Sequence, residues 1–175
     1  VMLHGIDEQP DAVRAQFPEG VSGQVFQAPK SWSLGKCMNH LAAEATGDFM
    51  AKFDDDDLYF ENYLRDQINA LEYSGADIVG KRASYLHHGQ SDSFLLRNPD
   101  HEMCFTDFVA GPTLVWRRQV TEGLAFPDRT KGEDTGFLNG AVKNGYTIYS
   151  ADRFNFVQMR SPSVAHTWEV DDEVI

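Results

Sequence analysis

The chain has 175 residues, 42% of them hydrophobic, so it is long enough and apolar enough for one folded domain. Its net charge of −12 argues against a general nucleic-acid or anionic-membrane surface, because those partners select basic faces. No apolar stretch reaches the roughly 20 residues of a membrane span, and the start of the chain does not resemble a signal peptide.

The first third of the chain alternates short strand and helix patterns. Ser33 is a suitable N-cap for a helix that ends at Gly47, because apolar residues recur at helical spacing between them. The chain opens directly on a strand pattern without an initiator methionine, so we expect a piece of a longer protein. The patterns predict strands at 1–3 and 23–27, a short helix within 7–17 and a longer one at 33–46.

Four consecutive aspartates, Asp54 to Asp57, follow an apolar run that is typical of a buried strand. Because side chains alternate along a strand, we expect Asp54 and Asp56 on one side, roughly 6.6 Å apart, with Asp55 and Asp57 on the other. Two charges at that distance repel by about 2.5 kcal/mol at an effective dielectric of about 20, and a hard divalent cation offsets this repulsion. Alternatively, Asp56 or Asp57 caps the helix that follows.

The alternation of strand and helix up to residue 80 favours a largely parallel sheet covered on both faces, with ligands at the C-terminal strand ends. Residues 82–107 are polar and broken, and we expect a hairpin and an exposed loop there. The patterns predict helices at 58–73 and 133–144, and strands at 76–80, 113–116 and 146–149.

The histidines of the polar region and the two cysteines show no metal-ligand spacing. His87, His88 and His101 stand in the polar region, so surface positions are expected. Cys37 and Cys104 belong to no CxxC motif, and we expect two free thiols and a cytoplasmic location.

A second acidic pair, Glu133 and Asp134, opens the predicted helix at 133–144. Acidic residues in a first turn complement the helix dipole, so a purely structural role is one interpretation. The order of the motifs favours another one. An aspartate cluster follows a strand, a Gly-Pro pair precedes the next strand, and Glu-Asp then opens a helix that ends in Asn-Gly-Tyr.

This order resembles the family 2 glycosyltransferases of the GT-A fold. The resemblance implies one domain at 1–175 with three α/β/α layers and a mostly parallel mixed sheet, of the nucleotide-diphospho-sugar transferase type. Within it, 1–80 would be the donor and metal half, and 81–175 the acceptor half with the catalytic base. The matching pieces, which cover about residues 1–150, are 33–39, 45–49, 53–57, 109–112, 116–118, 132–134 and Gly145-Tyr146.

The resemblance also implies roles for single residues. The D-x-D motif falls on Asp54 and Asp56, which would bind Mn²⁺ or Mg²⁺ on the donor diphosphate, and Asp54 could instead reach the ribose. The catalytic base falls on Asp134, while Glu133 would orient the acceptor or the helix end. Further expected positions are His166 for the metal, and Lys36, Asn39 and Trp168 for the substrates. For His166 the alternative is a solvent-facing residue, and Trp168 or Trp116 could simply be buried instead of stacking on a sugar.

The implied reaction moves a sugar, with inversion, from a nucleotide sugar to a hydroxyl of a glycan, lipid or protein acceptor. A UDP-sugar is the first expectation for the donor. Asp134 would remove the acceptor proton, and the cation would neutralise charge on the departing diphosphate.

Two departures from the family pattern keep alternatives open. Relatives begin with a further strand and helix that complete the nucleotide pocket. Met38 stands where they often carry arginine, and Lys36, two residues earlier, could supply that charge. A non-catalytic glycan- or nucleotide-binding remnant of the fold fits the missing strand. A Mg-dependent phosphoryl-transfer enzyme would also place aspartates at a strand end, although Leu58 replaces the threonine of a D-x-D-x-T motif.

Overall fold

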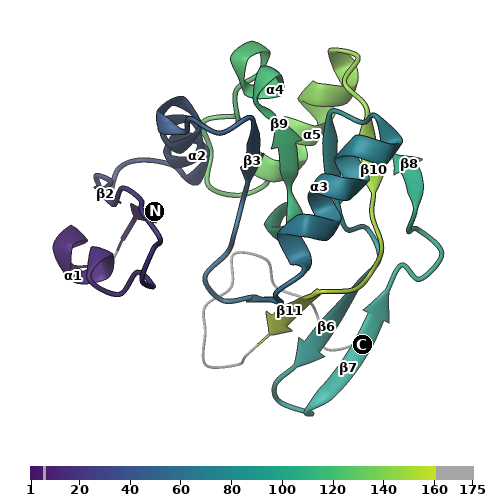
Figure 1. Cartoon of the computed structure of the whole chain (residues 1–175), viewed down its shortest axis with the longest axis horizontal. Helices are drawn as coiled ribbons and strands as arrows, with labels where there is room; N and C mark the ends of the chain where they lie inside the picture. The colour runs from purple at the N-terminus through teal and green to yellow at the C-terminus, as the bar shows by residue number, and fades with distance from the viewer. Residues whose placement is uncertain (6, 161–175) are drawn as a thin grey trace.

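The structure is a computed structural model that describes residues 1–5 and 7–160 (Figure 1). The helices are α1 (Pro10–Arg14), α2 (Leu34–Glu44), α3 (Tyr63–Ser74), the 3-10 turn η1 (Gly111–Thr113), α4 (Arg118–Gly123) and α5 (Glu133–Lys143). The strands are β1 (Met2–Leu3), β2 (Phe26–Gln27), β3 (Phe49–Ala51), β4 (Leu58–Tyr59), β5 (Ile78–Gly80), β6 (Ser84–His88), β7 (Ser93–Arg97), β8 (Cys104–Thr106), β9 (Val115–Arg117), β10 (Ile148–Ser150) and β11 (Phe156–Arg160).

The central sheet has five strands in the order β3-β9-β5-β10-β8. β5 and β10 pair in parallel, whereas β9 is antiparallel to both β3 and β5, and β8 is antiparallel to β10. Thus β3, β5 and β10 run in one direction, with β9 inserted between the first two. The expected mixed sheet is confirmed, but parallel neighbours are fewer than the strand and helix alternation suggested. β9 and β8 each follow a loop or hairpin, and antiparallel pairing needs no crossover helix.

Helices cover both faces of this sheet, as the three-layer prediction requires. Ile78 of β5 packs in one core with Val120 of α4 and Phe137 of α5. Its neighbour Val79 points the other way and packs with Leu71 of α3. Successive strand residues therefore bury opposite faces, and Figure 1 shows α3 crossing the front of the sheet.

A second sheet, in the order β4-β11-β6-β7, lies below the central sheet in the view of Figure 1. The predicted hairpin is β6-β7. The expected helix start at Leu58 is wrong, because Leu58 and Tyr59 pair with β11 and α3 begins only at Tyr63. The apolar residues at 58–60 fit either periodicity, and pairing with the distant strand β11, which sequence reasoning missed, decides between them.

Several helix boundaries agree with the predictions. The Ser33 hydroxyl accepts a hydrogen bond from the Lys36 amide (3.1 Å), as an N-cap should. Gly75 ends α3 in the left-handed conformation, with φ of 69°. Within the described residues, none of the helices has the length and apolar character needed to cross a membrane.

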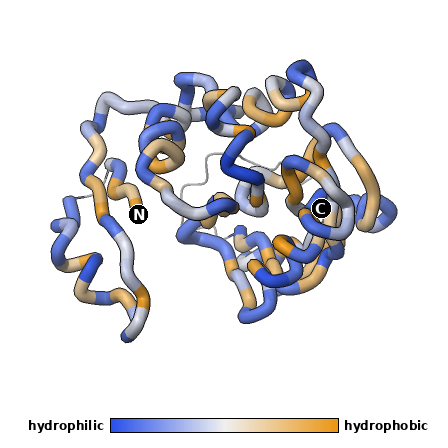
Figure 2. Tube along the Cα trace, turned by 45° about the horizontal axis from the view of Figure 1, so that its top comes forward, coloured by the Kyte–Doolittle hydropathy of each residue, from blue (hydrophilic) through white to orange (hydrophobic). Residues whose placement is uncertain are grey.

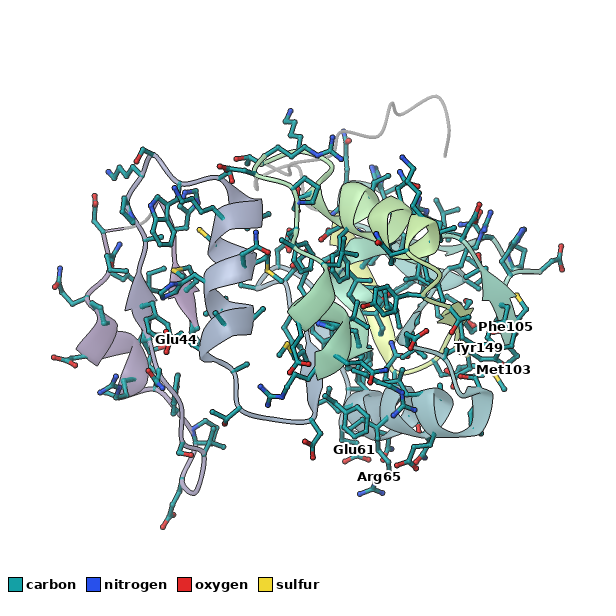
Figure 3. All side chains as sticks on the ribbon, turned by 90° about the horizontal axis from the view of Figure 1, so that it is seen from above. Glu44, Glu61, Arg65, Met103, Phe105 and Tyr149 are labelled. Carbon is teal, nitrogen blue, oxygen red and sulfur yellow. The ribbon has the colours of Figure 1, made fainter. Side chains whose placement is uncertain are left out.

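The two ends of the central sheet have different surroundings. The N-terminal segment with β1, α1 and β2 lies to one side of the main body in Figures 1 and 2, and its Phe26 contacts His40 of α2 (5.0 Å between ring centroids). At the opposite edge, Phe105 of β8 packs on Tyr149 of β10 (5.2 Å), with Met103 nearby (Figure 3). The aspartate run follows β3, far across the sheet from this aromatic edge.

Candidate active site

The four aspartates form a turn and not the end of a strand. β3 ends at Ala51, and the Asp57 amide donates to the Asp54 carbonyl (3.5 Å). Asp54, Asp56 and Asp57 each offer one carboxylate oxygen, and these oxygens lie within 4.8 Å of one another. The expectation that Asp57 points away from Asp54 and Asp56 is therefore wrong, because a turn replaces the two-residue alternation of a strand. Of the four aspartates, Asp55 alone is exposed and lies outside the group.

Contacts from three other elements hold this acidic turn in place. The Tyr59 hydroxyl accepts from the Asp54 amide (2.9 Å) and donates to the Pro112 carbonyl (2.9 Å). The Met159 amide of β11 donates to the Asp57 carboxylate (2.8 Å). Three converging carboxylates on a fixed turn match the oxygen ligands that Mg²⁺ or Mn²⁺ prefers, so these residues fit the expected cation.

The Asp57 carboxyl group is harder to ionise than usual. Its pKa is raised to about 6, mainly by burial and also by the charges of Asp56 and Asp54, while the hydrogen bond from Met159 opposes the rise. An ionised Asp57 is thus unfavourable in the folded protein when no cation is bound.

We expect Asp57→Asn to raise the melting temperature in metal-free buffer at about pH 7.5. The native pKa lies above the unfolded value of 3.8, so ionisation of Asp57 opposes folding above about pH 6, and this effect fades as the pH falls toward 4. Because the group is only half-buried, we expect about 1 kcal/mol and a gain of about 2–4 °C. Calorimetry in chelator at both pH values measures this, with the exposed Asp55→Asn as control. An equal gain in melting temperature at about pH 4 and at about pH 7.5 would show that the raised pKa of Asp57 is not the cause.

A buried lysine links the acidic turn to α5. Lys52 is 6% exposed, and its Nζ lies 2.7 Å from Asp54 Oδ1 and 3.3 Å from Asp134 Oδ2. Burial is the largest single influence on the pKa of Lys52, and it lowers this pKa. The carboxylates of Asp134 and Asp54 together outweigh burial, so the pKa of Lys52 is raised. Sequence reasoning missed Lys52, although a charged residue inside the apolar run at 49–53 was the available signal.

Asp134 is mostly buried at the start of α5, which follows Gly132 in the left-handed conformation (φ 73°). Its Oδ1 has no hydrogen-bond partner among the described residues, which is unusual for a buried carboxylate. Burial raises the pKa of Asp134, and the ammonium of Lys52 opposes that rise. Gly111 is close by, and a β-carbon there would lie 1.9 Å from Asp134 Oδ2, so only glycine leaves room for the carboxylate. Glu133 is buried beside it, and burial raises its pKa too.

These groups line one cavity of about 460 Å³ between the acidic turn, η1, the start of α5 and the second sheet. The structure therefore brings together the predicted Asp54, Asp56, Glu133 and Asp134, and adds Lys52 and Asp57 to them. Chemically, three carboxylates suited to a hard cation, and the separate buried carboxylate of Asp134 in the same cavity, are the groups needed to hold a cation-bound diphosphate and to accept a proton beside it.

Other predicted residues lie elsewhere. Lys36 is exposed with its Nζ 5.4 Å from the Trp32 ring, and both ends of the Asn39 amide bond the Phe126 backbone (2.8 Å each), so neither lines the cavity. Trp116 is 2% exposed in the core, which agrees with the alternative that it is simply buried. His166 and Trp168 fall outside the described residues. Cys37 and Cys104 are free thiols, as expected, and the cytoplasmic location stays a prediction.

Helices on both faces of a mixed sheet, with an acidic turn after an edge strand and a carboxylate from a helix start in the same cavity, define a protein of the GT-A type. A family model described as glycosyl transferase family 2 matches residues 7–107, more than half of the chain. The chain therefore belongs to glycosyl transferase family 2. No curated protein matches the sequence significantly.

Solved structures of TarS from S. aureus share the fold. TarS 1-349 in complex with UDP-GlcNAc has a TM-score of 0.68 at 15% identity, over 93% of this chain and 50% of that one. TarS 1-349 in complex with UDP has a TM-score of 0.67 at 17% identity, over 92% of this chain and 51% of that one. The chain thus spans about half the length of these TarS structures.

Proposed function

We propose that this domain transfers a sugar, with inversion and with help from a divalent cation, from a nucleoside diphosphate sugar to an acceptor hydroxyl. The observation that carries the proposal is the single cavity that holds the three-carboxylate group of the acidic turn and the buried Asp134. Membership of glycosyl transferase family 2 supports the class of reaction.

Asp54, Asp56 and Asp57 would hold the cation, with Mn²⁺ or Mg²⁺ as candidates, and His166 remains a proposed further ligand. When bound, the cation supplies positive charge that stabilises the departing diphosphate. The Asp57 pKa of about 6 leaves this carboxyl group mostly ionised, and so ready to act as a ligand, at neutral pH.

Asp134 would act as the general base. The acceptor oxygen attacks the anomeric carbon from the side opposite the diphosphate, the new C–O bond forms, and the old one leaves with its electron pair on the diphosphate. The acceptor proton passes to the Asp134 carboxylate, a contribution of about 10²- to 10⁴-fold. Lys52 holds this carboxylate in position and favours its ionised form, and Glu133 would orient the acceptor.

The first donor to test is a UDP-sugar. Two of the similar TarS structures contain UDP-GlcNAc and UDP, which supports UDP as a probe for this chain. The acidic turn lies in the proposed donor half, 1–80, and Asp134 in the proposed acceptor half, 81–175.

We expect Asp56→Ala to abolish the Mn²⁺-dependent part of UDP binding. The remaining carboxylates cannot replace a lost ligand of the cation without rebuilding the turn. Calorimetric titration of UDP with and without Mn²⁺ measures the effect, and Asp55→Ala is the matched control because Asp55 is exposed outside the group. Equal UDP affinity with and without Mn²⁺ in the unmodified chain would remove the metal site from the proposal.

Donor hydrolysis separates the remaining interpretations. With Mn²⁺ and UDP-GlcNAc, a transferase domain should release free sugar and UDP slowly, because water can take the place of the acceptor. A binding remnant should release neither, and a phosphoryl-transfer enzyme should release inorganic phosphate instead.

A further inference from the structure

One side of the cavity is apolar. Phe108, Ala110, Gly111 and Pro112 line it from the single stretch of chain between β8 and β9, whereas the charged side chains of the cavity come from other segments. We define these four residues as the apolar wall. Phe108 has the largest side chain among them, and it is 41% exposed. An aromatic ring is therefore open to solvent at the cavity that holds the acidic turn and Asp134.

The backbone on either side of Phe108 is fixed. The Phe108 amide donates to Thr106 Oγ1 (3.3 Å), and the Thr106 hydroxyl donates to the Phe108 carbonyl (3.2 Å). Val109 is fully buried in the core beneath, and the Ala110 amide donates to the Lys81 carbonyl (2.9 Å). Successive side chains of an extended chain point to opposite sides, which agrees with an exposed Phe108 beside a buried Val109. The ring thus stands on a segment that the core holds in place.

The apolar wall lies against the proposed base. A β-carbon on Gly111 would lie 1.9 Å from Asp134 Oδ2, so this carboxylate lies directly beside the backbone of the wall. Phe108 is three residues before Gly111, so the two α-carbons are at most about 10 Å apart. The Asp134 side chain is 19% exposed and lines the cavity. A molecule whose hydroxyl reaches Asp134 therefore meets the apolar wall.

The other end of the apolar wall is joined to the acidic turn. The Pro112 carbonyl accepts from the Tyr59 hydroxyl (2.9 Å), which in turn accepts from the Asp54 amide (2.9 Å). In chain order, the wall therefore contacts the acidic turn through Pro112 and Asp134 through Gly111, and it begins at Phe108. This order puts Phe108 on the acceptor side of Asp134, away from the proposed cation.

A flat aromatic ring at this place suits a cyclic sugar. A pyranose carries C–H groups on its faces and hydroxyls around its edge, so one face can pack on an aromatic ring while an edge hydroxyl reaches a carboxylate. The face of an aromatic ring is electron-rich and attracts weakly positive C–H hydrogens. An acyclic polyol has no fixed apolar face, and it loses bond rotations when it presents one.

We propose that the sugar ring of the acceptor packs on Phe108, so that the acceptor is a glycan with a pyranose ring and not an acyclic polyol, a lipid chain or a protein side chain. This inference rests on the proposed function, in which Asp134 takes the acceptor proton. Phe108 is then a specificity-determining residue of the acceptor site.

The test uses protein saturated with UDP and Mn²⁺, titrated with methyl β-glucopyranoside, sorbitol and hexanol and followed by NMR. Sorbitol offers hydroxyls without a ring, and hexanol offers an apolar chain without a ring. We expect the glucoside to bind at least about 5-fold more tightly than sorbitol, because only the glucoside has a face that packs on Phe108.

Three variants of Phe108 separate the ring from general apolar contact. Phe108→Ala should remove most of the preference for the glucoside, and Phe108→Leu should do the same although leucine is apolar. Phe108→Tyr keeps the flat ring and should keep the preference. Because Phe108 is exposed, all three should fold, which thermal unfolding checks. The matched control is Phe105→Ala, which removes a 61% exposed ring from the aromatic edge outside the cavity (Figure 3).

The contrary outcomes are distinct. Equal binding of the glucoside and sorbitol, or the same loss in Phe105→Ala, would overturn the role of Phe108 while the donor site stands. An unchanged preference in Phe108→Leu would show that no aromatic ring is needed, and tighter binding of hexanol than of the glucoside would assign Phe108 to a lipid acceptor. If UDP fails to bind the unmodified chain with Mn²⁺, the proposed function falls, and this inference falls with it.

Discussion

Replacing Asp134 by asparagine should lower sugar transfer at least 100-fold and leave the Kd for UDP nearly unchanged. The amide keeps the shape of the side chain and can still contact Lys52, but it cannot accept the acceptor proton, which removes a contribution of about 10²- to 10⁴-fold. Asp134 lies in the cavity with one oxygen held by Lys52 at 3.3 Å, outside the three-carboxylate group. Donor and cation binding should therefore survive.

The measurement is kcat/KM across pH, beside calorimetry with UDP and Mn²⁺. In the unmodified chain, activity should fall as the pH drops through the raised pKa of Asp134, and the variant should lose this limb. Glu133→Gln is the matched control on the same helix turn, and its loss should be smaller. Transfer at the unmodified rate in Asp134→Asn would take Asp134 out of the mechanism.

Replacing Lys52 by methionine should lower the free energy of unfolding by about 3 kcal/mol, which corresponds to a melting temperature roughly 6–12 °C lower. Methionine keeps the unbranched apolar stem of lysine but removes the ammonium group that pairs with the buried Asp134. A buried charge without a partner charge is strongly unfavourable. Without Lys52 the pKa of Asp134 rises further. The loss should therefore be largest at neutral pH and shrink as the pH falls and Asp134 becomes protonated.

A double-variant cycle separates the ion pair from simple loss of packing. Lys52→Met combined with Asp134→Asn should regain at least about 1 kcal/mol relative to Lys52→Met alone, because an asparagine needs no cation. Thermal unfolding of the four proteins gives the coupling. Additive losses would show that Lys52 contributes through packing and not through Asp134.

Several features could be predicted from the sequence because they depend on neighbours in the chain. The Ser33 cap, the glycine that ends α3 and the alternation of β5 between two cores each follow from residues a few positions apart. The same is true of the acidic pair at the start of α5, whose place in the first turn is fixed by Gly132 just before it. Caps, turns and periodic patterns depend on residues that are close together in the chain, so they can be predicted from a single sequence.

The remaining parts depend on residues that meet only when the chain has folded. The start of α3 was misplaced because Leu58 pairs with β11, almost 100 positions later in the chain. Asp57 joins the acidic turn because Met159 of β11 fixes its carboxylate. Lys52 meets Asp134 because β3 and α5 share one core, in which Met50 packs with Phe137. The sequence by itself determined the layered α/β class and pointed to Asp54, Asp56, Glu133 and Asp134, which line one cavity. Tertiary structure alone decided their charge partners, because ion pairs and strand pairing join segments whose distance in the sequence carries no information about their contact.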